Sequence, residues 1–271
     1  MSHTLSSGDS PLFTIIIATH DRPQLLQRTL ESLIAQTYQN FKLVIVADSA
    51  AYIPPYRELQ AFDRRFVYII RSGVNGPAES RNMGLDVTAG SDYIVFLDDD
   101  DTFRPGHLQA LADAIGSARP ELLFCDFQVQ NEDRTTYPPK ALSNQSVSIA
   151  DVTPASVYVR NRIPNSCVTY RSDVLATLRY DTDLILYEDW DFLLDALKGR
   201  SLRHVATDTV VIHKSQATAP ENMRRGNSRD EKIVEVMLQL YQKHPAPDME
   251  TRLTRQALLA GAGVKLGLEH F

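Results

Sequence analysis

Apolar and polar positions form successive blocks along residues 13–115, and the blocks differ in their period. Continuous apolar runs predict buried strands at 13–18, 42–47, 66–70 and 93–97. Apolar side chains at helical spacing predict helices at 25–34, 78–87 and 105–115. Strands that alternate with helices predict an α/β fold whose central sheet is mainly parallel, with helices on both faces.

After residue 121 the pattern is less regular. It predicts a strand at 122–129, a loop or hairpin at 131–148, a helix at 189–197 and a short strand at 210–213. Helices are also predicted at 230–243 and, weakened by glycines, at 249–268. We therefore expect residues 216–271 to form a C-terminal helical extension, and the polar residues 1–10 to form a disordered leader.

Composition narrows the class of protein. The chain has 271 residues, of which 43% are hydrophobic, enough for one sizeable core. Its net charge of −6 argues against a nucleic-acid partner. The sequence has no apolar run long enough for a transmembrane helix, no signal-peptide core and no CxxC pair, so a cytoplasmic protein is expected.

The strongest chemical feature is the run of four aspartates, Asp98–Asp101, directly after an apolar strand. Like charges this close raise one another's pKa unless a cation neutralises them, and Mg²⁺ or Mn²⁺ with oxygen ligands is the natural partner. The alternative is a solvated acidic loop that caps the next helix. Thr19 and Asp48 also end strands, so we expect them at the same ligand-binding edge of the sheet.

Three further features carry candidate chemistry. Arg81, near the start of a predicted helix, could pair with a nucleotide phosphate or base, or lie on the surface beside a carboxylate. Glu188 and Asp189 begin an apolar helix, where a carboxylate could accept a proton from a hydroxyl or simply cap the helix. His213 ends a predicted strand, where it could bind a metal or make an ordinary hydrogen bond.

Taken in order, these segments resemble the family 2 glycosyltransferases, which have the Rossmann-like GT-A fold. The matching segments are Ala18–Arg22, Ala47–Ala50, Gly76–Asn82, Leu97–Asp101 and Glu188–Asp189. The resemblance implies a GT-A domain over 11–215, with a nucleotide-sugar half at 11–120 and an acceptor half at 121–215. Departures from the family pattern at His20, Ala47 and Val74 bear on the identity of the nucleobase.

The resemblance also implies roles for individual residues. The implied nucleotide-binding residues are Thr19, Asp48, Asn75, Arg81, Asp98 and Asp99. The implied ligands of a Mn²⁺ or Mg²⁺ ion are Asp100, Asp98 and His213. Asp189 is implied as the catalytic base, with Glu188 beside it.

The implied reaction is an inverting transfer from a nucleotide-diphospho-sugar, with UDP the expected nucleotide. The implied acceptor is a saccharide or a lipid-linked molecule, as in polysaccharide or glycoconjugate synthesis. The C-terminal helices are candidates for forming a homodimer or for peripheral docking at the inner face of a membrane.

Two alternatives to sugar transfer are a phosphohydrolase and a non-catalytic relative. Asp98–Thr102 resembles the Asp-x-Asp-x-Thr motif of haloacid-dehalogenase phosphohydrolases, but here the motif follows the fourth predicted strand rather than the first. The second alternative is a non-catalytic, nucleotide-binding relative of the glycosyltransferases.

Overall fold

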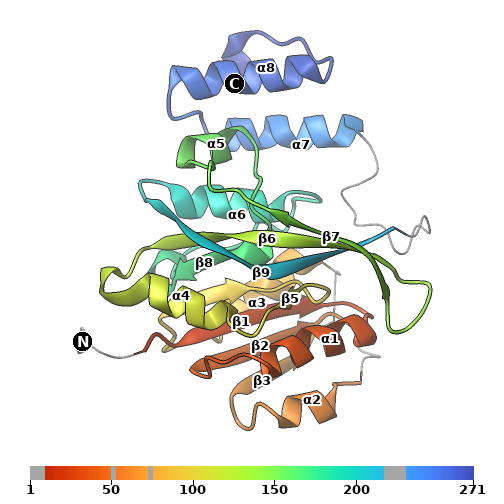
Figure 1. Cartoon of the computed structure of the whole chain (residues 1–271). Coiled ribbons are helices and arrows are strands. Elements are labelled where there is room, and N and C mark those ends of the chain that lie inside the picture. The colour runs from red at the N-terminus through yellow and green to blue at the C-terminus, as the bar shows by residue number, and fades with distance from the viewer. Residues whose placement is uncertain (1–9, 50–52, 73–75, 217–229) are drawn as a thin grey trace.

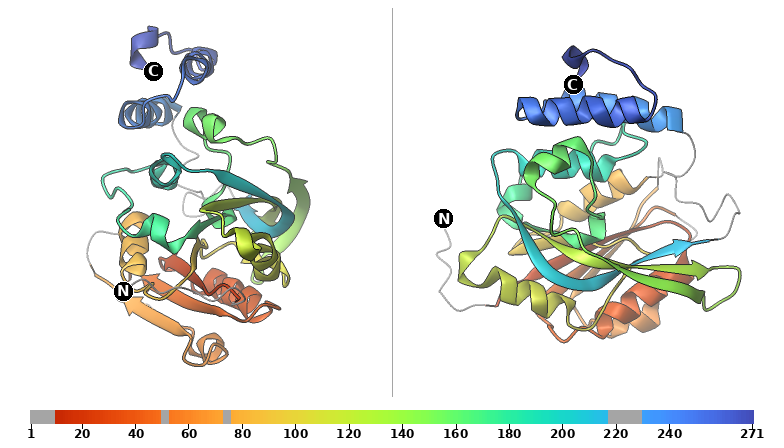
Figure 2. Two further views of the ribbon diagram at one scale, coloured as in Figure 1. Left: turned by 90° about the vertical axis from the view of Figure 1, so that its left-hand side faces the viewer. Right: turned by 45° about the horizontal axis from the view of Figure 1, so that its top comes forward.

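The computed structural model describes residues 10–49, 53–72, 76–216 and 230–271. Residues 1–9 of the predicted leader at 1–10 lie outside the described residues, as does Asn75. Figure 1 shows one central sheet, with the C-terminal helices stacked at one end of the molecule and the N-terminal strands toward the other. Figure 2 shows the same order from two further directions.

The N-terminal half of the sheet is parallel. Its strands are β3 (Phe66–Ile70), β2 (Phe41–Ala47), β1 (Phe13–Thr19) and β4 (Tyr93–Phe96), in this spatial order. The intervening helices are α1 (Pro23–Ile34), α2 (Tyr56–Gln60) and α3 (Pro77–Leu85). The alternation predicted from the sequence is therefore confirmed here, and it brings the carboxyl ends of β1, β2 and β4 to one edge.

The second half of the sheet mixes strand directions. From β4 the order continues with β8 (Val168–Arg171), β6 (Leu122–Asp133), β9 (Leu202–Ser215) and β5 (Thr102–Phe103), while β7 (Lys140–Val147) pairs with β6. β6 and β9 run parallel, whereas β8 is antiparallel to both of its neighbours. The sequence predicts either a loop or a hairpin at residues 131–148. The structure has the hairpin there, in which β6 and β7 pair antiparallel.

The remaining helices are α4 (His107–Ile115), α5 (Pro154–Val159), α6 (Glu188–Leu197), α7 (Asp230–Lys243) and α8 (Met249–Gly261). The last helix ends earlier than residue 268, because glycine weakens a helix and Gly263 adopts a positive φ of 85°. Among the described helices, none is both long and apolar enough to cross a lipid bilayer.

Packing between α3 and the sheet depends on a glycine. A Cβ at Gly84 would lie 2.5 Å from Cγ2 of Ile16, a fully packed side chain of β1. Only a residue without a side chain lets α3 approach β1 this closely. This approach sets the position of Arg81, which lies one turn earlier on the same helix.

Candidate functional site

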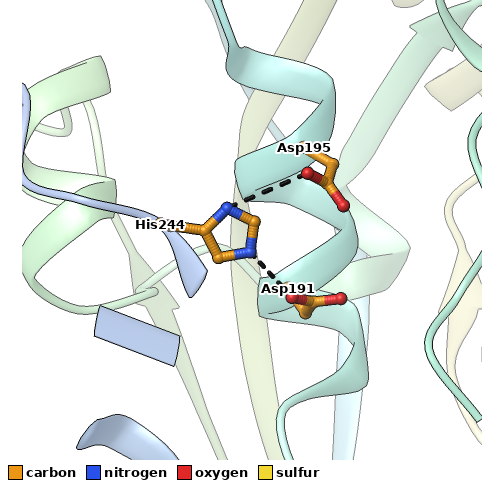
Figure 3. Close-up of side chains that lie close together, drawn as sticks. All are labelled: Asp191, Asp195 and His244. Atoms are coloured by element: carbon orange, nitrogen blue, oxygen red, sulfur yellow. Dashed lines mark hydrogen bonds and ion pairs between the residues drawn. The ribbon is translucent and has the colours of Figure 1, made fainter. Parts of the chain in front are cut away.

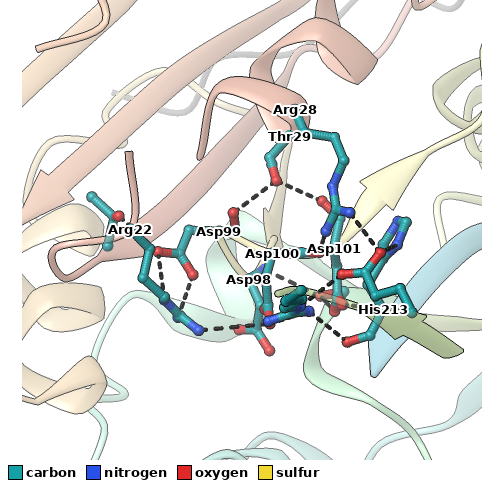
Figure 4. Close-up of polar contacts among 12 residues, drawn as sticks. Arg22, Arg28, Thr29, Asp98, Asp99, Asp100, Asp101 and His213 are labelled. Atoms are coloured by element: carbon teal, nitrogen blue, oxygen red, sulfur yellow. Dashed lines mark hydrogen bonds and ion pairs between the residues drawn. The ribbon is translucent and has the colours of Figure 1, made fainter. Parts of the chain in front are cut away.

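The four aspartates after β4 point in different directions (Figure 4). Asp99, Asp100 and Asp101 are 0%, 4% and 0% exposed, so the run is not a solvated loop. Asp99 accepts a hydrogen bond of 2.7 Å from the Thr19 hydroxyl and is paired with Arg22. Burial raises the pKa of Asp99 to about 7, although the charge of Arg22 opposes this rise.

Asp100 and Asp101 bind groups from distant parts of the chain. Both terminal nitrogens of Arg134 lie 3.1 Å from an Asp100 carboxylate oxygen. Asp101 accepts a hydrogen bond of 2.8 Å from Ser166 and one of 3.2 Å from the backbone N–H of His213. The acidic turn is thus held by contacts to three other segments.

Helix α1 holds the backbone of the same turn. The Thr29 hydroxyl lies 2.9 Å from the carbonyl oxygen of Asp99 and 2.8 Å from that of Asp101. Arg28 donates a hydrogen bond of 2.8 Å to the carbonyl oxygen of Asp100 (Figure 4). Because these carbonyls accept bonds from a packed helix, the turn presents its carboxylates in a defined geometry.

His213 lies on β9 beside the acidic turn. Its Nδ1 is 3.0 Å from a carboxylate oxygen of Glu132, and its Nε2 is 2.9 Å from the hydroxyl of Thr102. Burial lowers the pKa of His213, while Glu132 opposes the change. Both ring nitrogens therefore have protein partners, and metal binding by His213 stays a prediction.

Arg81 joins the aspartate run to the second acidic motif. Its two terminal nitrogens lie 2.9 Å from Asp98 and 2.9 Å from Glu188, at the start of α6. The guanidinium also lies over the ring of Tyr180, 5.2 Å from the ring centre. Arg81 is 7% exposed, so it is a buried bridge between two carboxylates and not a surface arginine.

Asp189 lies directly beside this bridge. One of its carboxylate oxygens accepts a hydrogen bond of 2.8 Å from the backbone N–H of Trp190. Burial and the neighbouring Glu188 raise the pKa of Asp189 to about 6, although Arg81 opposes the rise. A carboxylate with a pKa near neutral pH is suited to accept a proton from a hydroxyl group.

Asp48 forms a second polar cluster at the ends of β1, β2 and β3. Its carboxylate lies 2.5 Å from Nδ1 of His20 and 3.8 Å from Arg71, and it accepts a hydrogen bond of 3.0 Å from the backbone N–H of Gly76. The structure thus places Asp48 at the carboxyl ends of these strands, and its contact with a nucleobase stays a prediction. Thr19, by contrast, binds the buried Asp99.

The aspartate run supplies the oxygen donors that a divalent cation requires. Mg²⁺ is usually bound by one or two carboxylates, with substrate phosphates and water completing its shell. Asp98 and Asp100 follow β4 two residues apart and could each supply a carboxylate to such an ion. Among the described residues, Asp98, Asp100 and His213 do not converge as a three-ligand cluster, so their joint binding of a metal stays a prediction. The guanidinium groups of Arg81, Arg22 and Arg134 lie beside these carboxylates and neutralise their charge.

A different cluster brings three potential metal ligands together, Asp191, Asp195 and His244 (Figure 3). Nε2 of His244 lies 2.7 Å from Asp191, and Nζ of Lys243 lies 2.9 Å from the other oxygen of Asp191. Asp191 lies on α6, whereas Lys243 ends α7 and His244 follows it, so these contacts link α6 to the C-terminal helices.

Several residues that complete the site carry little recognisable signal in the sequence pattern. Four such residues have no recognisable spacing relative to the aspartates along the chain: Arg22, Arg28, Glu132 and Arg134. Each of them contacts an aspartate of the run or another of the four residues. Glu132 carries the clearest signal, because it is a carboxylate in a segment that continues a predicted strand. It is 0% exposed and binds both Arg28 and Arg134.

Comparison with known proteins places this arrangement in a class. A family model described as glycosyl transferase family 2 matches residues 14–175. The chain therefore belongs to this family and is a glycosyltransferase. The assignment favours sugar transfer over the phosphohydrolase and the non-catalytic alternatives.

Individual relatives agree with this assignment. The uncharacterized glycosyltransferase YwdF of Bacillus subtilis is 28% identical over 88% of this chain and 86% of its own length. The succinoglycan biosynthesis protein ExoW of Rhizobium meliloti is 38% identical over 35% of this chain and 31% of its own length.

Solved structures support the predicted fold. The structure of S. aureus TarS 1-349 in complex with UDP-GlcNAc aligns with a TM-score of 0.65 at 15% identity, covering 92% of this chain and 71% of TarS 1-349. The GT-A fold expected from the sequence is confirmed by this likeness.

Proposed function

We propose that this glycosyltransferase moves a sugar from a UDP-sugar to an acceptor hydroxyl with inversion, aided by Mn²⁺ or Mg²⁺. The UDP-GlcNAc complex of the structurally similar TarS supports a UDP-linked donor. The succinoglycan biosynthesis protein ExoW supports a role in the synthesis of a polysaccharide or glycoconjugate. The acceptor is then a saccharide or a lipid-linked molecule.

The observation that carries this proposal is the Arg81 bridge. The single guanidinium group of Arg81 contacts both Asp98, which follows β4, and Glu188, at the start of α6. The donor diphosphate and the base must approach the same anomeric carbon, so the two motifs must lie side by side. Their direct linkage through a buried arginine meets this requirement.

In the proposed reaction, Asp189 accepts the proton of the acceptor hydroxyl as its oxygen forms a bond to the anomeric carbon. The bond between that carbon and the diphosphate oxygen breaks, and UDP leaves. Asp100 and Asp98 would hold the divalent cation, which when bound stabilises charge on the leaving diphosphate. Arg81 keeps Glu188 and Asp98 oriented toward the site.

The nucleobase is proposed to bind near Asp48, whose carboxylate can accept a hydrogen bond from a uracil N–H. Thr19 and Asp99 would contribute to the nucleotide site together, since the Thr19 hydroxyl donates a hydrogen bond of 2.7 Å to Asp99. We assign the donor half to 11–120 and the acceptor half to 121–215. Homodimer formation and peripheral membrane association of residues 216–271 remain predictions.

The test is UDP release from a panel of UDP-sugars, with Mn²⁺, with Mg²⁺ and with EDTA. The proposal expects release that depends on a divalent cation and that is lost in Asp100→Asn. Asp113→Asn, on the exposed side of α4, is a matched control and should behave as wild type. Metal-independent release, or full activity of Asp100→Asn, would contradict the proposed metal site.

A further inference from the structure

A cavity lies between the two C-terminal helices and the segment that precedes α6. Its volume is about 720 Å³, which falls in the range of about 300–1,000 Å³ typical of small-molecule sites. Helix α7 contributes Ile233 and Met237 to the wall, and α8 contributes Leu258. The polar side chains of the described lining are Arg160 and Tyr187, so the cavity is mostly apolar with one cationic group.

The polar end of this cavity adjoins the proposed base. Tyr187 immediately precedes Glu188 and Asp189, and its ring contacts that of Trp190 edge to face at 5.7 Å. Burial raises the pKa of Tyr187, the charge of Arg160 opposes the rise and that of Asp189 adds to it. A ligand against Tyr187 would therefore lie at the N-terminal end of α6, the helix that also carries Asp189.

Arg160 is exposed, and among the described residues no carboxylate is paired with it. Arg162, two residues further along, is paired with Asp151 at 2.5 Å. The arginines near the aspartate run, Arg81 and Arg134, are likewise engaged with carboxylates. An unpaired guanidinium beside an apolar cavity is suited to bind a phosphate joined to a hydrocarbon chain.

We propose that this cavity binds the lipid portion of a lipid-linked acceptor, with the hydrocarbon chain between α7 and α8 and its phosphate on Arg160. This inference rests on the proposed sugar transfer, because it assigns the acceptor of that reaction. The hydrocarbon chain would be removed from water by its contact with the apolar wall of the cavity, which favours binding. The attached saccharide would then reach from Arg160 past Tyr187 to Asp189.

Trp190 allows a direct binding test, since it is the only tryptophan of the chain and contacts Tyr187. We would titrate the full chain with dodecyl phosphate and with neutral dodecyl maltoside, below their micelle concentrations, and follow tryptophan fluorescence. Arg160→Gln should weaken dodecyl phosphate by about tenfold or more and leave dodecyl maltoside unchanged. Leu258→Gln should weaken both, and the matched control Arg162→Gln should weaken neither.

Two results would overturn the inference. One is the lack of a saturable fluorescence change with dodecyl phosphate, or a change that Arg160→Gln does not weaken. The other is a dimer in sedimentation experiments that Leu258→Gln dissociates and dodecyl phosphate does not, because the cavity would then be an interface between two copies. UDP binding with Mn²⁺, measured by thermal shift, tests the donor site separately, so its failure would count against the proposed function alone.

Discussion

Replacing Asp189 by asparagine should abolish transfer and at the same time stabilise the folded protein. The substitution removes one charge and keeps the size of the side chain and an oxygen that can accept the hydrogen bond from the N–H of Trp190. Loss of a general base typically slows a reaction by about 10²–10⁴-fold. The opposite signs of the two effects separate a catalytic group from a structural one.

The stability effect follows from the pKa. Burial and Glu188 raise the pKa of Asp189 from 3.8 to about 6. At 1.36 kcal/mol per pKa unit, this shift corresponds to roughly 3 kcal/mol. The folded state holds the proton more tightly than the unfolded state, so this stability is present below pH 4 and is lost as the pH rises through about 6. At pH 8 the asparagine variant should therefore be more stable than wild type by up to about 3 kcal/mol.

Urea unfolding of both proteins at pH 4 and pH 8 measures this difference, and UDP release in the presence of an acceptor measures transfer. The stability gain should be present at pH 8 and nearly absent at pH 4. In the wild-type enzyme, kcat/KM should fall about tenfold per pH unit below pH 6, because the base becomes protonated. A variant that is less stable at pH 8, or that retains turnover, would refute the assignment of Asp189 as a buried base.

Three further predictions concern the framework of the site. Arg81→Ala should lower the free energy of unfolding by about 3–5 kcal/mol in urea titrations, because it leaves two carboxylates without their buried partner. Gly84→Ala should cost about 1–3 kcal/mol, measured as a lower Tm, because its new Cβ would meet Ile16 at 2.5 Å. Asp191→Asn should weaken the contact with His244 and increase hydrogen exchange in α7 and α8; unchanged exchange would contradict the link between α6 and these helices.

Much of the N-terminal half could be predicted because its signals are local. A buried parallel strand needs a continuous apolar run, and β1, β2 and β4 each have one. The short strand β8 could not be predicted, since its four residues form a strand only between β4 and β6. Strand β9 is longer than its apolar run at 210–213, because pairing with β6 extends it toward Leu202.

For the candidate site, the sequence by itself determined which groups follow the strands: Asp48 after β2, the aspartate run after β4, and Glu188 and Asp189 at the start of α6. Only the tertiary structure decided their partners. Arg81 and Glu188 are 107 residues apart, and Arg28 and Glu132 are 104 residues apart. The charge state and orientation of a carboxylate depend on the groups that surround it in space. Because those groups come from distant parts of the chain, the local sequence pattern does not reveal them.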